Sequence, residues 1–110
     1  MTSKSEFREA LSRFPTGITI LSLRTPNGLL AGLTVSAFTS VSLEPPMVLA
    51  CVDARSRCVP SLVEGQPFAF SILREDQADI AEHFAAPIDD KFSKVPYEYG
   101  ANRAPLISGA

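Results

Sequence analysis

The sequence lacks several features that commonly indicate a function, and each absence excludes a class of protein. It contains no run of about 18 apolar residues, so no segment is expected to span a membrane. The fingerprints GxGxxG and GxxxxGK[ST] are both missing, which removes the main support for the common nucleotide-binding folds. Ten Lys and Arg against twelve Asp and Glu give a net charge of −2. That balance disfavours nucleic acid as the main partner, because binding phosphate backbones requires concentrated positive charge.

Cysteine and histidine are scarce. Cys51 and Cys58 have a spacing that fits neither a zinc knuckle nor a CxxC redox pair, so no metal site is predicted. Cys51 lies in an apolar run and is expected to be a small core residue. His83 is the only histidine, and its surroundings are typical of a helix, where a solvated side chain is commoner than a catalytic one. Any Ser/His/Asp triad would rest on it alone, and we predict no catalytic side chain.

The length and composition are those of one small domain. A chain of 110 residues has room for a single domain, and 45% hydrophobic with 20% charged residues is enough to form a core. The first nine residues are polar and charged and include no apolar stretch of the kind found in secretory signals. We therefore expect a cytoplasmic protein.

Short apolar runs separated by turns predict a mainly β fold with peripheral helices. The expected helices are one that ends at Phe14, one at 57–64 and one from 76, and the expected strands are 18–25, 29–35, 47–52, 68–73 and one from 106. The first helix follows a Ser3–Glu6 capping box and is expected to cover one end of the β core. Pro45-Pro46 should break strand pairing, and the strand at 47–52 should be covered on both faces. Pro26-Asn27-Gly28 is a strong signal for a hairpin turn, and short strands joined by such turns favour an antiparallel barrel over a doubly wound sheet.

Two polar segments follow apolar strands and are the candidate binding site. The segment Thr34–Ser42 is rich in hydroxyls, which need partners in the backbone, in water or in a polar ligand. Gly32, just before it, indicates a bulge or a close approach to the backbone. In Asp53–Arg57, the arginines could bind a phosphate beside the start of a helix, with Ser56 and Arg57 favoured over Arg55. The alternatives are a strand satisfied by its own backbone and a solvated Arg/Asp loop.

Four blocks of sequence carry a resemblance to a known family. They are Phe7–Thr19 (FREALSRFPTGIT), Ala31–Pro46 (AGLTVSAFTSVSLEPP), Ser56-Arg57 and Asp90-Lys91-Phe92, in that order. Together they resemble the short-chain flavin reductases, the flavin-reductase-like family whose members supply reduced flavin to two-component monooxygenases. The resemblance extends over nearly the whole chain.

The resemblance implies an FMN-binding split β-barrel, Greek-key-like and usually homodimeric. Such a protein binds FMN or FAD and takes hydride from NADH or NADPH. Positions matching Thr34, Val35, Ser36 and Ala37 would line the isoalloxazine ring, and those matching Ser40, Ser42, Asp53, Ser56 and Arg57 would hold the ribityl-phosphate side. Lys91 and Phe92 would lie near the cofactor. Hydride transfer by stacking and proximity explains why no acid, base or nucleophile is found.

Family members continue for several strands beyond the positions of Gly109 and Ala110. The resemblance therefore implies that residues 1–110 form a single flavin-reductase-like domain that lacks C-terminal strands of the barrel. Two alternatives to an active reductase remain: a non-catalytic flavin-binding or dimerisation module, and an inactive fragment of a reductase. The choice between FMN and FAD, the choice between NADH and NADPH, and the recipient oxygenase are open.

Overall fold

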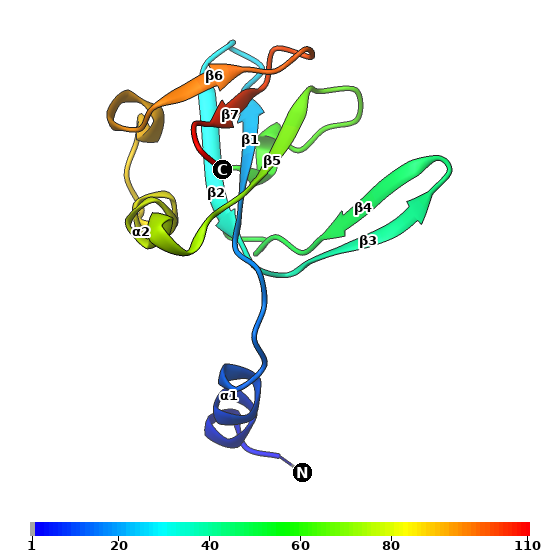
Figure 1. Cartoon of the computed structure of the whole chain (residues 1–110), viewed down its shortest axis with the longest axis vertical. Helices are drawn as coiled ribbons and strands as arrows, with labels where there is room; N and C mark the ends of the chain where they lie inside the picture. The colour runs from blue at the N-terminus through cyan, green and yellow to red at the C-terminus, as the bar shows by residue number, and fades with distance from the viewer. Residues whose placement is uncertain (1) are drawn as a thin grey trace.

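The computed structural model describes residues 2–110, which form three small antiparallel sheets and two α-helices (Figure 1). One sheet has the strand order β2-β1-β5, and the pairs β3-β4 and β6-β7 form the other two. The strands are β1 Thr19–Arg24, β2 Leu30–Val35, β3 Phe38–Leu43, β4 Pro46–Ala50, β5 Phe68–Ile72, β6 Tyr97–Tyr99 and β7 Pro105–Ile107. The helices are α1 Lys4–Ser12 and α2 Ala78–Ala85, with 3₁₀ turns at Val59–Ser61, Glu75–Gln77 and Lys91–Lys94. The prediction of a mainly β domain is confirmed.

Strand β1 is the centre of the core because it lies between β2 and β5 and is covered on both faces. Ile20 packs with Phe84 of α2 on one face, together with Phe92 and Ile107. Leu21 and its neighbours pack against Val35 and Cys58 on the other face. Period-2 alternation thus sends side chains of one strand into two separate clusters. The β1–β2 hairpin turns at Asn27-Gly28, as predicted, with Gly28 at a φ of +83°.

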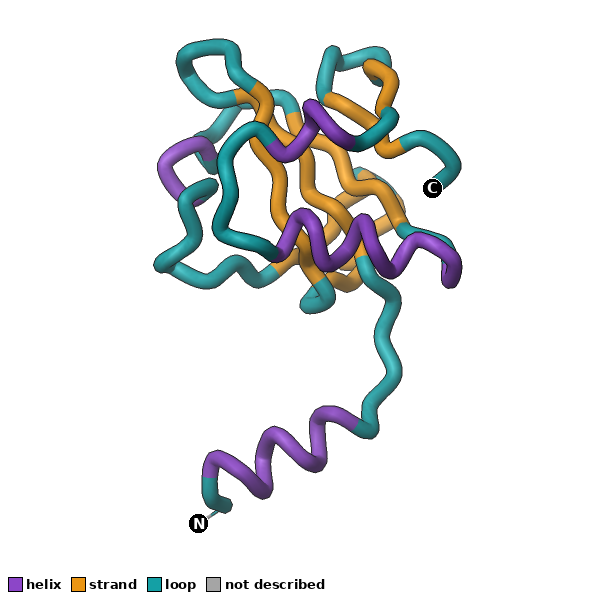
Figure 2. Tube along the Cα trace, turned by 90° about the vertical axis from the view of Figure 1, so that its left-hand side faces the viewer, coloured by secondary structure: helices purple, strands orange, loops and turns teal. Residues whose placement is uncertain are grey.

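Helix α2 lies across the strands on the face of Ile20 (Figure 2). Gly32 on β2 permits this approach, since a Cβ there would lie 2.9 Å from Cε1 of Phe84 and 3.1 Å from Cε2 of Phe92. The Oγ1 of Thr34 donates a hydrogen bond of 2.6 Å to the carbonyl of Ala81 in α2. The sequence-based expectation of a close approach at Gly32 is therefore confirmed, and the approaching group is an aromatic ring.

Helix α1 begins as predicted but does not cover the core. Ser3 and Glu6 form the capping box, and the helix ends at Ser12 rather than Phe14. None of its residues is buried, and Phe7 and Phe14 are both well exposed. The linker that contains Pro15 carries α1 away from the strands, as Figures 1 and 2 both show. The prediction failed because a helical pattern identifies an apolar face and not the surface that this face meets.

The β3–β4 hairpin, which we call the arm, also stands out from the three-stranded sheet (Figure 1). Pro45-Pro46 does not break its pairing, because Pro46 is the first residue of β4, where a missing N–H is tolerated. Strand β4 is not covered on both faces: Leu49 is 55% exposed. Cys51, just beyond β4, is exposed rather than in the core. An apolar run reports hydrophobicity, and its burial depends on a partner that the run does not specify.

The remaining differences concern short elements. The helix predicted at 57–64 is a single 3₁₀ turn, Val59–Ser61, with Pro60 inside it. Strand β6 and the 3₁₀ turn Lys91–Lys94 were not predicted from the sequence. Among residues 2–110, the helices are too short and too polar for any of them to cross a bilayer.

Candidate functional site

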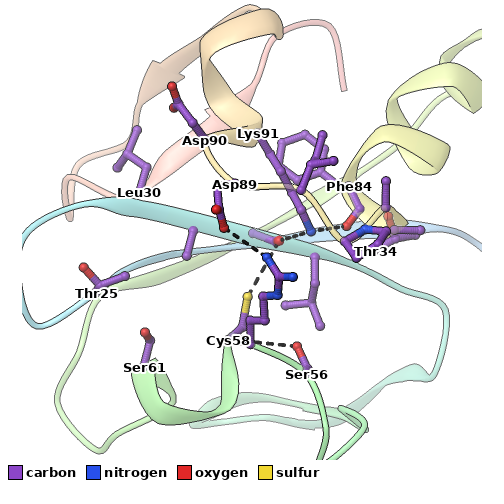
Figure 3. Close-up of a pocket in the computed structure, with 18 of the residues that line it drawn as sticks. Thr25, Leu30, Thr34, Ser56, Cys58, Ser61, Phe84, Asp89, Asp90 and Lys91 are labelled. Atoms are coloured by element: carbon purple, nitrogen blue, oxygen red, sulfur yellow. Dashed lines mark hydrogen bonds and ion pairs between the residues drawn. The ribbon is translucent and has the colours of Figure 1, made fainter.

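A cavity of about 610 Å³ lies along β2, the edge strand of the three-stranded sheet. Its wall comes from β2 itself, from the loop that follows β4, and from the segment that runs from the end of α2 to Lys91. Figure 3 shows Asp90 and Lys91 on one side of the β2 ribbon and Ser56, Cys58 and Ser61 on the other. Segments far apart in sequence are thus brought to one strand edge.

Lys91 secures the open edge of β2. Its Nζ donates to the carbonyl of Gly32 at 3.1 Å and to the carbonyl of Phe84, near the C-terminus of α2, at 2.6 Å. The thiol of Cys58 lies 3.7 Å from the same Gly32 oxygen. The N–H and C=O of one residue in an antiparallel strand point to the same side, so the N–H of Gly32 faces the same edge as its carbonyl. Because Lys91 bonds both β2 and the end of α2, its ammonium group fixes the strand, the helix end and the cavity wall relative to one another.

The electrostatic setting of Lys91 favours an anion nearby. Burial lowers the pKa of its amine below the usual value, and the proximity of Arg57 lowers this pKa further, while Cys58 acts in the opposite direction. The two cations share one cavity wall and repel each other. An anion that entered between them would relieve this repulsion and raise the pKa of Lys91 again.

Arg57 forms an ion pair that links two segments of the cavity wall. Its Nη1 lies 3.0 Å from Oδ1 of Asp89, a residue 32 positions further along the chain. Both side chains are exposed, Arg57 by 68% and Asp89 by 93%. An exposed ion pair contributes little to stability, so the guanidinium can exchange this carboxylate for another anion.

The turn before Arg57 is stabilised by its own side chains. Asp53 accepts hydrogen bonds from the backbone N–H and the guanidinium of Arg55, and these bonds lower the pKa of the Asp53 carboxyl to about 2. Ser56 Oγ accepts a hydrogen bond from the N–H of Cys58 at 3.2 Å, just before the 3₁₀ turn Val59–Ser61. Arg55 thus pairs with Asp53 within its own turn, whereas Arg57 pairs with a residue of another segment.

The cavity brings together four of the residues predicted for the site. Thr34, Ser56, Arg57 and Lys91 line it, so members of both polar segments share one cavity. The other predicted residues lie outside its wall: Val35 and Phe92 are buried in the two core clusters, Ser36 and Ala37 are exposed beyond β2, Ser40 and Ser42 are on the arm, and Asp53 is in the turn. Phe92 packs at 4.9 Å from the ring centroid of Phe84, where it supports the adjacent Lys91.

Sequence reasoning missed Asp89, Cys58 and Phe84 as residues of the cavity wall. No local pattern in the sequence indicates that Asp89 forms an ion pair with a residue 32 positions away. His83 is half-buried rather than solvated, with Nε2 at 2.7 Å from the carbonyl of Lys91. Within residues 2–110, no group of three or more His, Cys, Asp or Glu side chains could hold a metal ion.

The chain is similar to proteins of one family. The family model described as "Flavin reductase like domain" matches residues 11–110. A stachydrine N-demethylase reductase subunit of Rhizobium meliloti (strain 1021) is 38% identical over 101 residues, covering 92% of this chain and 44% of that protein. The reductase component of 4-hydroxyphenylacetate 3-monooxygenase from Thermus thermophilus is 43% identical over 82 residues, covering 74% of this chain and 54% of that protein.

Solved structures agree with the sequence matches. The NADH:FAD oxidoreductase SgcE6 of Streptomyces globisporus C-1027 superposes with a TM-score of 0.87 at 37% identity, covering 98% of this chain and 65% of that one. The same protein has been solved in complex with NAD and FAD fragments. The chain spans between 32% and 61% of the length of the first curated relatives that it matches. From the family model and these identities, the chain belongs to the flavin reductase like domain family.

Proposed function

We propose that this chain binds FMN or FAD in the cavity along β2 and acts in the NAD(P)H-dependent reduction of flavin, supplying reduced flavin to a partner monooxygenase. The observation that carries the proposal is the meeting of Ser56, Arg57 and Lys91 in one cavity beside an open strand edge. Two cations and a hydroxyl at a single opening suit a phosphorylated ligand.

The residues present fit a flavin in size and in chemistry. A cavity of about 610 Å³ falls within the range of about 300–1,000 Å³ that is usual for small-molecule sites. The guanidinium of Arg57 offers paired N–H donors that match the oxygens of a phosphate. The edge of β2 offers backbone groups, which suit the polar rim of a flat heterocyclic ring.

Each predicted residue has a role in the proposal. Arg57 and Ser56 would hold the phosphate, while the backbone of Thr34–Ala37 would lie along the ring. The hydroxyl of Thr34 is already donated to Ala81, so Thr34 would contact the ring through its backbone and methyl group. Lys91 would fix the strand edge, and Phe92 would support Lys91. Roles for Ser40, Ser42 and Asp53 require the ligand to extend past the end of β2, toward the arm and the turn.

The reaction requires no acid or base from this chain. When bound, the flavin supplies the redox chemistry by accepting hydride from the nicotinamide. The residues of the chain would hold the ring, fix the phosphate and exclude water from the reacting face. The names of the relatives, an NADH:FAD oxidoreductase and reductase components among them, support a reductase over a non-catalytic module.

The arm supports the further proposal that the chain forms a homodimer. Leu43 is 90% exposed, and Val41, Met47 and Val48 are also exposed on the same hairpin. A second, apolar hollow of about 290 Å³ lies between β4 and the face of β1 and β5. Apolar surface of this kind is expected to be covered by another protein surface. Sedimentation velocity of Leu43→Asp should show a loss of dimer, whereas Leu29→Asp, on the β1–β2 turn, should not.

We treat residues 1–110 as one flavin-reductase-like domain with a split-barrel arrangement in the assembled protein. The family model matches all but the first ten residues of it. The expectations of further barrel strands and of a cytoplasmic location stay predictions.

The proposed function is tested by mixing the purified chain with FMN and NADH. We expect the flavin absorbance at about 450 nm to bleach at a rate proportional to protein concentration. Binding of flavin without bleaching would support the non-catalytic module instead. Absence of binding to FMN, FAD and riboflavin would contradict the proposal as a whole.

A further inference from the structure

We propose that Asp89 is a specificity-determining residue, which competes with the flavin phosphate for Arg57 and so weakens the binding of phosphomonoester flavin relative to unphosphorylated flavin. The inference rests on the proposed function, because it assigns selectivity to the same cavity. It concerns a residue that neither the sequence patterns nor the reaction required.

The geometry places Asp89 where the phosphate would have to bind. Its Oδ1 lies 3.0 Å from Nη1 of Arg57, and both residues belong to the cavity wall. The two side chains reach each other from separate segments, the loop after β4 and the segment after α2. A phosphate that takes the guanidinium must therefore displace the carboxylate or sit beside it.

The other two cations of the cavity wall, Arg55 and Lys91, have partners of a different kind. Arg55 is paired with Asp53 in its own turn. Lys91 donates to the carbonyls of Gly32 and Phe84, which are neutral acceptors. Within the described residues, Arg57 is the cation of this wall whose carboxylate partner also lines the cavity. Asp89 therefore determines whether the guanidinium of Arg57 is available to a ligand.

The charge of the ligand determines how strongly Asp89 opposes it. The phosphomonoester of FMN carries a charge of about −1.5 to −2 at pH 7 and would be repelled most by a neighbouring carboxylate. The phosphates of FAD are diesters and carry less charge each, so they would be repelled less. Riboflavin has no phosphate and would not sense Asp89 at all. The predicted order of sensitivity is FMN, then FAD, then riboflavin.

The experiment is a binding titration of FMN, FAD and riboflavin against the whole chain and its Asp89→Asn variant. We expect the affinity for FMN to rise about two- to fivefold, with a smaller rise for FAD and none for riboflavin, and the gain should shrink at high salt. Asp89→Lys should extend the gain for FMN. The matched control is Asp76→Asn, which removes another exposed Asp–Arg pair, with Arg74 at 3.1 Å, away from the cavity.

The outcomes separate this inference from the proposed function. If the flavins bind but Asp89→Asn leaves the ratio of FMN to riboflavin affinity unchanged, the role of Asp89 is wrong and the flavin site stands. A loss of FMN affinity in Asp89→Asn would likewise overturn the inference, because Asp89 would then be orienting Arg57 for the phosphate. If none of the three flavins binds the unaltered chain, both proposals fail together.

Discussion

Two regions of the molecule contain similar apolar residues but bury them to different extents. One is the three-stranded sheet with α2, and the other consists of α1 and the arm, which project from it. Ile20, Leu21 and Leu23 of β1 are at most 3% exposed, whereas Val48 and Leu49 of β4 are about half exposed. In the sequence β4 is the more continuous apolar run of the two, since Ser22 interrupts the apolar residues of β1. The difference is that β1 has neighbours on both edges and cover on both faces, and β4 has a single neighbour, β3.

This contrast assigns different tasks to the two regions. Burying a large aliphatic or aromatic side chain contributes about 1.5–3 kcal/mol to the free energy of unfolding. Within one chain, the sheet with α2 gains most of this stabilisation, because its apolar side chains are the buried ones. That region therefore positions the cavity wall. On the arm, the same free energy remains available for association with another surface, which is the basis of the proposed dimer.

The largest expected effect compares one residue from each region. Phe84→Ala should lower the free energy of unfolding by about 3–5 kcal/mol, because the ring is fully buried between β2 and Phe92. Leu43→Ala on the arm should change it by no more than about 0.5 kcal/mol at a concentration where the chain is monomeric. Urea denaturation of both variants gives the two values. Equal losses of unfolding free energy in the two variants would contradict the difference between the two regions.

The next effect concerns ligand binding. Arg57→Ala should weaken flavin binding by about 1.5–3 kcal/mol, the contribution of a charge-assisted hydrogen bond. Arg74→Ala, which removes another exposed arginine that is paired with a nearby aspartate, is the control and should leave affinity unchanged. Fluorescence quenching of FMN reports both.

Ser42→Ala sharpens the same comparison, because Ser42 lies on the arm and outside the cavity wall. Its effect on flavin affinity should be smaller than that of Arg57→Ala. A loss as large as that of Arg57→Ala would place the ligand on the arm, and the division between the two regions would not hold.

A smaller effect is expected from a pair of glycines. Gly32→Ala should destabilise the fold by about 1–3 kcal/mol, because the new Cβ would press on the rings of Phe84 and Phe92. Gly17→Ala, in the linker that leads from α1, meets no atom within 4 Å and should be neutral or slightly stabilising. Thermal unfolding measures the two. A neutral Gly32→Ala would mean that α2 does not rest on β2.

The smallest expected effect separates two buried serines of the same sheet. Ser22 Oγ is buried and, among residues 2–110, finds no hydrogen-bond partner, so Ser22→Ala should stabilise the fold by up to about 1 kcal/mol. Ser71 Oγ accepts from the N–H of Ile107 at 3.0 Å, so Ser71→Ala should destabilise it by about 1–2 kcal/mol. We therefore predict that the two substitutions change the stability of the fold in opposite directions, and one series of thermal unfolding experiments measures both. Destabilisation by both substitutions would show that Ser22 has a partner after all.

Local signals predicted local structure well. The capping box at Ser3, the hairpin turn at Asn27-Gly28 and the close approach at Gly32 were each confirmed, because each depends on a few neighbouring residues or on the absence of a side chain. The preference for Arg57 over Arg55 as a phosphate ligand stays a prediction, and the structure shows that Arg55 closes a turn with Asp53. Such features are determined by short-range sterics and hydrogen bonding.

Features that depend on distant partners were not predictable. The exposure of β4 and the separation of α1 from the core follow from which surfaces meet, and an apolar pattern does not encode this. The pair of Arg57 with Asp89 joins residues that no motif links. The resemblance supplied the family, whereas the contacts that hold Lys91 on the edge of β2 required coordinates.

The most direct test of the account is a crystal structure of the chain with FMN. We predict that the phosphate lies within hydrogen-bonding distance of Arg57 and Ser56, that Asp89 no longer pairs with Arg57, and that the ring lies along β2. A phosphate bound elsewhere, with the Arg57–Asp89 pair intact, would contradict the central claim that this cavity is the flavin site.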